Sequence, residues 1–244
     1  MTGEPFTNRL IRIADQVFDL FPEYRRGLVF ANDIQNGQSP DSLLALLRQQ
    51  EQQTRLELAG QDINAVPRLE RWREAFRLTG IKPTKFRPSI DGLARRVLSG
   101  NDLPSINRVV DIGNLVSLKY LVPVGAHATD VIQTGMHLRP ANGSEDFCPF
   151  GTQEWEHPEP GEIIFADGSQ VMTRRWAWRQ AEHSIVKDST TAVEFNIDLL
   201  PPLPDDLYGT IIGDVQELVD RFCGGTLRTA LLERLSPQAA LDEP

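Results

Sequence analysis

The chain has 244 residues, an ordinary globular composition and a formal net charge of -9 at neutral pH. This length can bury a sizeable core in one large domain or two small ones, and the absence of an apolar run of about 18 residues excludes a membrane span. The acidic charge argues against broad, sequence-independent contact with a nucleic-acid backbone, although arginines in the middle of the chain still allow a local basic site.

Two features of the sequence bear on its compartment and chemistry. The first residues include Glu4 and show amphipathic spacing, in place of a basic stretch followed by an apolar core, so we expect no signal peptide and a cytoplasmic protein. Cys148 and Cys223 are far apart and show no metal-ligand spacing. We therefore expect two free thiols, no metal and no cofactor.

The first part of the chain predicts mainly helices. Apolar residues at helical spacing predict a helix over residues 8–20, and residues 27–31 are typical of a strand. Ser39-Pro40-Asp41 favours a helix start, with a cap followed by proline. Residues 67–79 predict the next helix, and Ser89 is expected to cap a short one.

The second part predicts strands, a long loop and a closing helix. Glu194, Asn196 and Asp198 alternate with apolar residues, which predicts a half-buried last strand. We expect disorder over residues 236–244. Helices clustered early and late without regular βαβ alternation predict an α+β fold, in one domain over residues 1–235. The expected strands cover residues 120–124, 131–138, 162–166, 170–173 and 193–199, the loop covers 139–160, and the last helix runs from about 205 to Gly224.

The most unusual predicted helix covers residues 107–118. Asn107, Asp111 and Asn114 fall at i, i+4 and i+7, so two amides and a carboxylate share one stripe of an otherwise apolar helix. Such groups cost about 1 to 3 kcal/mol each when they are buried without partners. The stripe therefore either opens onto a polar pocket or bonds to neighbouring loops as a structural network.

Two further stretches carry candidate functional groups. Gly125 is expected to form a turn beside His127 and Asp130, which favours a site for a small polar molecule. Arg174-Arg175-Trp176-Ala177-Trp178-Arg179 follows the predicted hairpin, and a continuing strand would place alternate residues on opposite sides. Arginine beside tryptophan binds carboxylates or phosphates and stacks flat rings, but it also forms surface cation–π braces. His183, next to Glu182, is either an acid or base or a structural histidine.

Several sequence stretches together resemble a known family. They are FRPSIDGLARR, LPSINRVVDIGNLVSLKYLVPVGAHATD, the PGE at residues 160–162, RRWAWR and TTAVEFNID. They resemble the free-standing B3/B4-domain proteins, which are similar to the editing domain of the β subunit of phenylalanyl-tRNA synthetase. In the synthetase this domain hydrolyses wrongly charged tyrosine from tRNA. The resemblance implies a single B3/B4-type domain, with β-sandwich-like sheets of unusual topology flanked by helices, and a stand-alone aminoacyl-tRNA deacylase.

The resemblance also implies roles for some residues, and at other positions this sequence departs from that of the synthetase. It implies that Gly113 and Asn114 line the amino-acid pocket. The synthetase has a histidine two residues after the proline that matches Pro123, whereas this chain has Gly125 there and His127 nearby. The synthetase glutamate that recognises the tyrosine hydroxyl falls near residues 184–185, where this chain has no acid.

The sequence thus predicts an editing hydrolase whose partner is the acceptor end of tRNA or a smaller aminoacyl ester. Two alternatives stay open: a non-catalytic binder of an amino acid or RNA end, and a small-molecule hydrolase that reuses the pocket. The candidate catalytic residues are Asn107, Asp111, Asn114, His127 and His183. The candidate substrate-binding residues are Arg87, Gly113, Gly125, Arg174, Arg175, Trp178 and Arg179.

Overall fold

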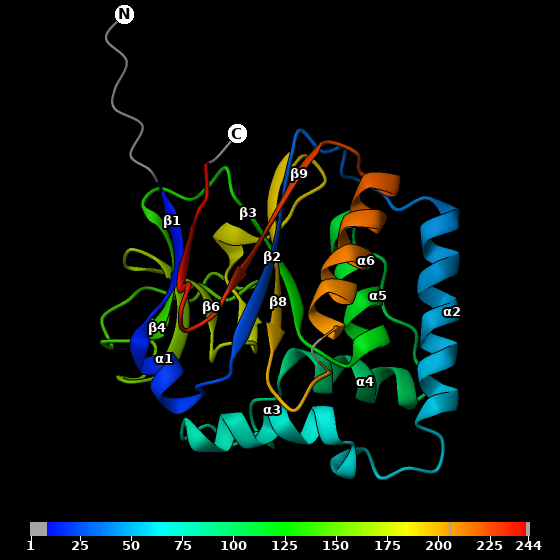
Figure 1. Ribbon diagram of the computed structural model, residues 1–244, viewed down its shortest axis with the longest axis horizontal. Coiled ribbons are helices and arrows are strands. Elements are labelled where there is room, and N and C mark those ends of the chain that lie inside the picture. The colour runs from blue at the N-terminus through cyan, green and yellow to red at the C-terminus, as the bar shows by residue number, and fades with distance from the viewer. Residues whose placement is uncertain (1–8, 205, 243–244) are drawn as a thin grey trace, which may run out of the picture.

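The computed structural model describes residues 9–204 and 206–242. Two β-sheets face each other, and helices cover the outer face of one sheet and one end of the sandwich (Figure 1). The fold is therefore α+β, with sandwich-like sheets flanked by helices, as the sequence predicts. The helices are α1 (Asp15–Leu20), α2 (Asp41–Glu57), α3 (Pro67–Leu78), α4 (Ser89–Leu98), α5 (Arg108–Tyr120) and α6 (Leu207–Phe222).

The sheets mix near and distant parts of the chain. Sheet A has the order β10-β1-β4-β5-β6-β7, and sheet B has the order β3-β8-β2-β9. Strands β1 and β4 pair in parallel, and the other pairs are antiparallel. The strands are β1 (Leu10–Ile13), β2 (Arg25–Asn32), β3 (Val124–Ala128), β4 (Gly135–Pro140), β5 (Ile163–Asp167), β6 (Gln170–Arg174), β7 (Arg179–Gln180), β8 (Ala192–Leu199), β9 (Thr226–Leu232) and β10 (Gln238–Ala240).

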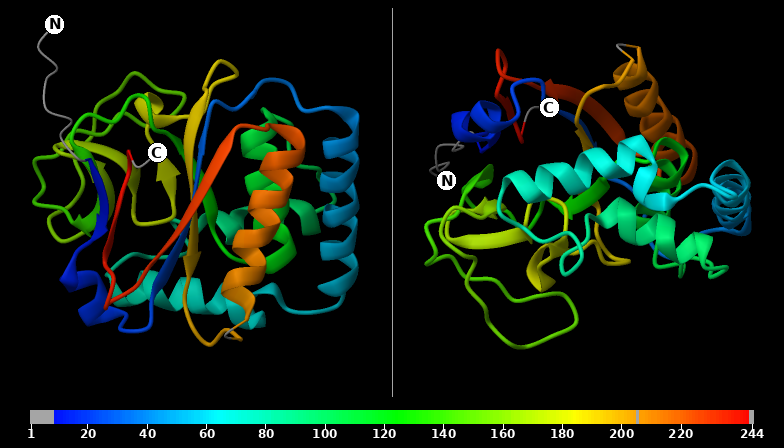
Figure 2. Two further views of the ribbon diagram at one scale, coloured as in Figure 1. Left: turned by 45° about the horizontal axis from the view of Figure 1, so that its top comes forward. Right: turned by 90° about the horizontal axis from the view of Figure 1, so that it is seen from below.

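Three apolar clusters hold these layers together. One lies between the sheets and extends to α3 and α4, which cross one end of the sandwich in the view from below (Figure 2). The second joins the outer face of sheet B to α2, α5 and α6. A small third cluster lies under the long loop on the outer face of sheet A. Burial of this apolar surface is the main favourable term in folding.

Strand β8 is buried on both faces, which differs from the half-buried strand expected. Phe195 and its apolar alternates pack against α5 and α6. Glu194, Asn196 and Asp198 face the other way and are at most 5% exposed. Sheet A covers that second face, so the polar residues lie between the two sheets and not in solvent.

Near the ends of the chain, several local predictions are wrong. Residues 10–13 form strand β1 and not the start of a helix. Ile11 and Ile13 point into the core while exposed Arg12 points out, and β4 and β10 supply backbone partners on both edges of the strand. The expected disordered tail contains β10, and β9 was not predicted. Neither Ser39 nor Ser89 caps its helix.

Around the expected site, the chain also departs from prediction. Helix α5 includes Tyr120, and left-handed Leu121 ends it, so the following strand begins only at Val124. Strand β6 stops at Arg174, because Arg175 and Trp176 both have left-handed backbone. The residues that follow therefore do not alternate across a sheet. No helix in the described ranges is both long and apolar enough to cross a bilayer.

Candidate active site

A cavity of about 410 Å³ lies where β3, the edge strand of sheet B, meets helix α5 and the turn after β6. This volume is typical of small-molecule sites, which measure about 300 to 1,000 Å³. Gln180 of β7 ties the two sheets together beside the cavity, because its side-chain amide donates to the carbonyls of Ala126 and Ser184 at 3.0 and 2.8 Å. Hydrogen bonds therefore connect the two sheets at the edge of the cavity.

The outer wall of the cavity is mainly apolar. Val109 and Val110 contribute from α5, and Val186 contributes from the loop before β8. At the rim, Ile106 and Phe150 are more than half exposed, at 54% and 56%. Large exposed apolar side chains around a concavity are typical of a binding mouth. This wall suits an apolar or aromatic group of a ligand.

The inner wall is polar and comes from the row on β8. His127 lies directly opposite Glu194, and Gly125 lies opposite Asn196, in the antiparallel pairing of β3 and β8. Side chains at such opposed positions share one face of the sheet. A β-carbon on Gly125 would lie 3.0 Å from the Asn196 Oδ1 atom, so the glycine leaves the space that the Asn196 amide occupies.

A hydrogen-bonded series joins Thr173 of β6 to His127 and Glu194. We call these three residues the triad. The Thr173 Oγ1 atom lies 2.9 Å from His127 Nε2, and the Glu194 Oε2 atom lies 3.2 Å from His127 Nδ1. A carboxylate only accepts, so we place the proton on Nδ1, and Nε2 then accepts from the threonine hydroxyl. The Asn196 amide nitrogen also lies 3.2 Å from Nδ1, but with the proton there it donates only to Glu194. His127 and Glu194 are buried, whereas Thr173 is partly exposed and lines the cavity.

A second polar cluster lies deeper between the sheets and contains Tyr24, Arg26, Trp176 and Asp198; we call it the Tyr24 cluster. Tyr24 donates its hydroxyl hydrogen to Asp198, and Arg26 Nε donates to the same carboxylate at 3.0 Å. The Trp176 indole donates to the Tyr24 oxygen at 3.3 Å. Burial raises the pKa of Asp198, although Arg26 opposes that rise, and burial also raises the pKa of Tyr24.

The polar residues of the predicted stripe on α5 differ in their surroundings: some bond within the protein, and one faces the cavity. The Asn107 Oδ1 atom accepts from the Val110 amide at 3.1 Å, and Nδ2 donates to the Val186 carbonyl at 3.0 Å. Asp111 is fully buried and accepts from Ser39, Ser105 and the Ile106 amide. Of the three stripe residues only Asn114 lines the cavity, beside its neighbour Gly113. In the described ranges the Asn114 amide has no hydrogen-bond partner, so it is free to bind a ligand.

The arginine–tryptophan stretch divides in the same way. Arg174 forms a two-point ion pair with Glu162, at 2.8 and 2.7 Å, and contacts Glu156 at 2.6 Å. Arg175 stacks over the Phe86 ring, with its guanidinium carbon 3.7 Å from the ring centroid. Neither of these two arginines lines the cavity, whereas Trp178 and Arg179 do. Arg179 is thus the cation available at this mouth.

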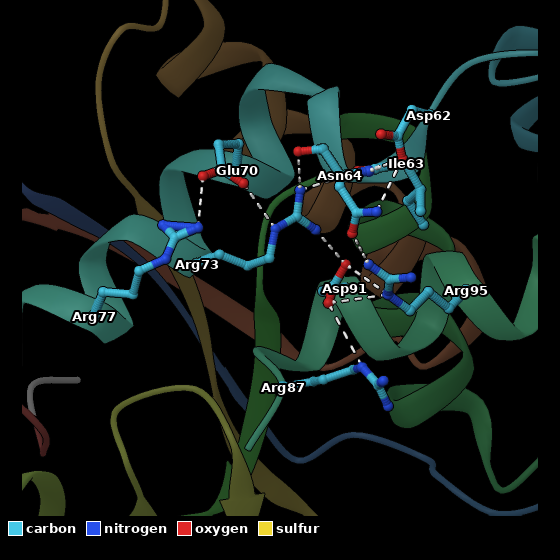
Figure 3. A network of polar contacts seen from close by, with 9 residues as sticks. All are labelled: Asp62, Ile63, Asn64, Glu70, Arg73, Arg77, Arg87, Asp91 and Arg95. Atoms are coloured by element: carbon cyan, nitrogen blue, oxygen red, sulfur yellow. Dashed lines mark hydrogen bonds and ion pairs between the residues drawn. The ribbon is translucent and has the colours of Figure 1, made fainter. Parts of the chain in front are cut away.

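Two further predicted residues, Arg87 and His183, also lie outside the cavity lining. Arg87 is exposed and only 4.0 Å from Asp91, at the edge of a polar network between α3 and α4 (Figure 3). Asp91 accepts from Arg73 at 2.7 Å and from Arg95 at 3.2 Å, and this network fixes α4, whose Ser89 lines the cavity. His183 is partly buried, and burial together with nearby His127 lowers the pKa of its imidazole.

Sequence reasoning missed three residues of the candidate site: Thr173 and Asn196, which line the cavity, and Glu194, which bonds to His127. The alternation on β8 was visible in the sequence, but it was interpreted as a solvent-facing side. The sequence offers one signal for them. TTAVEFNID is among the stretches that resemble the family, and neither a helix nor a turn accounts for its polar residues. His127 and Gly125 were predicted, but they lie within a strand and not at a turn.

The comparisons with known proteins concern the region around this cavity. Residues 71–204 match the model of the B3/4 domain. A crystal structure of an N-terminal fragment of the phenylalanyl-tRNA synthetase beta-subunit from Pyrococcus horikoshii is similar at 13% identity and a TM-score of 0.45, over 91% of this chain and 51% of that one. The chain thus spans about half the length of that fragment. A comparison with curated proteins gives no match. Because the matched residues make up more than half of its length, the chain belongs to the B3/4 domain family.

Proposed function

We propose that the chain hydrolyses an aminoacyl ester at the acceptor end of tRNA and so removes a wrongly attached amino acid. One observation carries the proposal: a single cavity joins an apolar wall, suited to an amino-acid side chain, to a polar inner wall that holds a threonine hydroxyl against a histidine. The likeness of the sequence to a synthetase editing domain directs the choice of ester. A cytoplasmic location belongs to the same proposal.

The residues around the cavity have distinct roles in this proposal. The amides of Asn114 and Asn196 orient the polar part of the aminoacyl group, and Arg179 faces the ribose or terminal phosphate. Holding the reacting groups in place lowers the barrier because it removes the entropy cost of bringing them together. Arg174, Asn107 and Asp111 act on this site only by fixing its walls, since their polar groups are engaged by the protein. Arg175 is stacked on Phe86 and does not line the cavity.

The proposal is tested with a panel of tRNAs that carry wrong amino acids, by measuring the free amino acid released over time. Val110→Trp fills the apolar wall and is expected to abolish release. The matched control is Leu78→Trp, which adds the same side chain at an exposed helix position far from the lining. Equal release by the two variants, or no release by the unmodified protein from any member of the panel, would contradict the proposal.

A non-catalytic binder of a free amino acid is the second candidate, and one observation favours it. The chain carries a net charge of -9, and among the arginines of the 174–179 stretch only Arg179 lines the cavity. Few cations at the mouth favour a small ligand over a whole tRNA. A thermal-shift screen distinguishes the two: stabilisation by a free amino acid without any ester turnover supports the binder.

A further inference from the structure

We propose that Thr173 is the nucleophile of this cavity, that His127 is its general base, and that Glu194 positions the imidazole. The inference deepens the proposed ester hydrolysis and rests on it. It names a covalent route, in which the amino acid passes through an ester with the Thr173 side chain before water releases it.

The geometry satisfies the requirements for an activated hydroxyl. A nucleophile and its base must lie within about 2.6 to 3.2 Å, and the base must be oriented by a third group. Thr173 Oγ1 and His127 Nε2 are 2.9 Å apart, and Glu194 accepts from the opposite ring nitrogen at 3.2 Å. The Asn196 amide also approaches Glu194, at 3.3 Å, and so helps to hold the carboxylate in place.

Three elements bring the triad together, and none of them is a mobile loop. His127 and Glu194 are opposed residues of β3 and β8 in sheet B, and Thr173 belongs to β6 in sheet A. His127 therefore bridges the two sheets, and its ring packs against Phe165 with 5.1 Å between ring centroids. A site on rigid strands holds its reacting groups more accurately than a site on loops.

The triad and the Tyr24 cluster both reach the cavity, but with different groups. In the Tyr24 cluster, Trp176 and Asp198 line the cavity, yet they are only 2% and 1% exposed, and the Asp198 carboxylate already accepts from Tyr24 and Arg26. In the triad, His127 and Glu194 are buried, but Thr173 is partly exposed and lines the cavity. The arrangement therefore presents a hydroxyl that is hydrogen-bonded to a histidine at the place where a ligand binds.

The reaction balances with water as the only co-reactant. The Thr173 oxygen bonds to the carbonyl carbon of the aminoacyl ester while its proton moves to His127 Nε2. The tetrahedral intermediate collapses, the bond to the ribose oxygen breaks, and His127 returns the proton to that oxygen. Water then attacks the threonine ester with the same base, and the amino acid leaves as the carboxylic acid.

The direct test is covalent labelling of the full chain with p-nitrophenyl acetate, followed by peptide mass spectrometry. We expect an acetyl group on Thr173. Thr173→Val keeps the shape and removes the hydroxyl, and should prevent labelling and lower tRNA deacylation by at least about 100-fold. Thr173→Ser restores a hydroxyl and should stay within about tenfold of the unmodified protein. The variants need matching thermal stability for this comparison.

Glu194→Gln tests the positioning role. The amide oxygen still accepts from Nδ1, but the negative charge is lost, so the protonated imidazole is stabilised less. We expect kcat to fall while KM stays unchanged, and the acid limb of the kcat profile to move to lower pH. The charged and titratable groups around the triad, Arg26, Asp198 and His183, are unchanged in this variant. A purely structural role would lower stability without moving the profile.

The outcomes separate this inference from the proposed function. Deacylation of tRNA by Thr173→Val at the unmodified rate would overturn the nucleophile and leave the hydrolase proposal standing. Labelling of a residue other than Thr173 would also overturn it. Acetylation of Thr173 in a protein that deacylates no tRNA would support the triad and contradict the tRNA substrate.

Discussion

Two rows of polar side chains flank the same cavity, one on helix α5 and one on strand β8, and they differ in what holds them. Asn107 and Asp111 on α5 are fully engaged by backbone groups and serine hydroxyls. On β8, Glu194 accepts from His127 and from the Asn196 amide, and Asn196 lines the open space. In the proposed function, the helix row therefore fixes architecture and the strand row supplies chemistry.

The comparison shows why a buried polar residue is not by itself evidence of a site. Both rows interrupt apolar elements, and both avoid the cost of unpaired burial. They differ in how many of their polar residues line the cavity. On α5 only Asn114 does, whereas on β8 both Asn196 and Asp198 line it and Glu194 bonds to His127, which also lines it. The predictions below are ordered from the largest expected effect to the smallest.

The largest effect is expected on stability at Asp111. Asp111→Ala removes the acceptor for Ser39, Ser105 and the Ile106 amide in a fully buried position. We expect the free energy of unfolding to fall by about 3 kcal/mol, because three donors lose their partner. Urea unfolding measures the loss. A small loss of stability together with a large drop in turnover per folded molecule would assign a chemical role to α5 and contradict the contrast between the two rows.

The second prediction uses two glycines of the cavity wall as a matched pair. Gly125→Ala places a methyl group 3.0 Å from Asn196 and should displace that amide, at a cost of about 1 to 2 kcal/mol and at least about tenfold in turnover. Gly113→Ala lies in the helix, and its methyl group would be 3.7 Å from the nearest atom. It should stabilise the protein by about 0.5 to 1 kcal/mol. Equal effects of the two would contradict the assignment.

Asn114 should affect binding without affecting stability. Its amide lines the cavity and has no hydrogen-bond partner in the described ranges, so Asn114→Ala should change the free energy of unfolding by less than about 0.5 kcal/mol. Loss of one hydrogen bond to the ligand should raise KM by about tenfold. Steady-state kinetics and a thermal melt check both statements, and a lowered melting temperature with unchanged KM would refute them.

The effect that is smallest at neutral pH concerns a histidine far from both rows. Burial, with Arg12 and Arg139 nearby, lowers the pKa of His137 from 6.5 to about 4. Between these values the unfolded chain binds a proton that the folded chain does not, so stability falls as the pH falls from 6.5 to about 4. His137→Gln should flatten this dependence in urea unfolding at a series of pH values. An unchanged slope would assign the acid sensitivity to other groups.

Sequence reasoning reached the fold class and the helix-plus-strand frame of the cavity because periodicity reports burial directly. It could not find the polar inner wall, since alternation on β8 has the same appearance whether the polar side meets water or a second sheet. The strand prediction failed at residues 175–176, because nothing in the local sequence shows that these two non-glycine residues adopt left-handed backbone. β1 was mistaken for helix because its partners, β4 and β10, are distant in sequence.

The most direct measurement is the affinity of a non-hydrolysable aminoacyl-adenosine, with an amide in place of the ester, for two variants by calorimetry. Asn196→Ala removes an amide of the strand row, and Asp111→Asn keeps the shape of the helix row while removing its charge. We expect the dissociation constant to rise by about tenfold for Asn196→Ala, as for one lost hydrogen bond, and to stay unchanged for Asp111→Asn. Unchanged affinity in Asn196→Ala together with weakened binding in Asp111→Asn would contradict the assignment of function to the strand row.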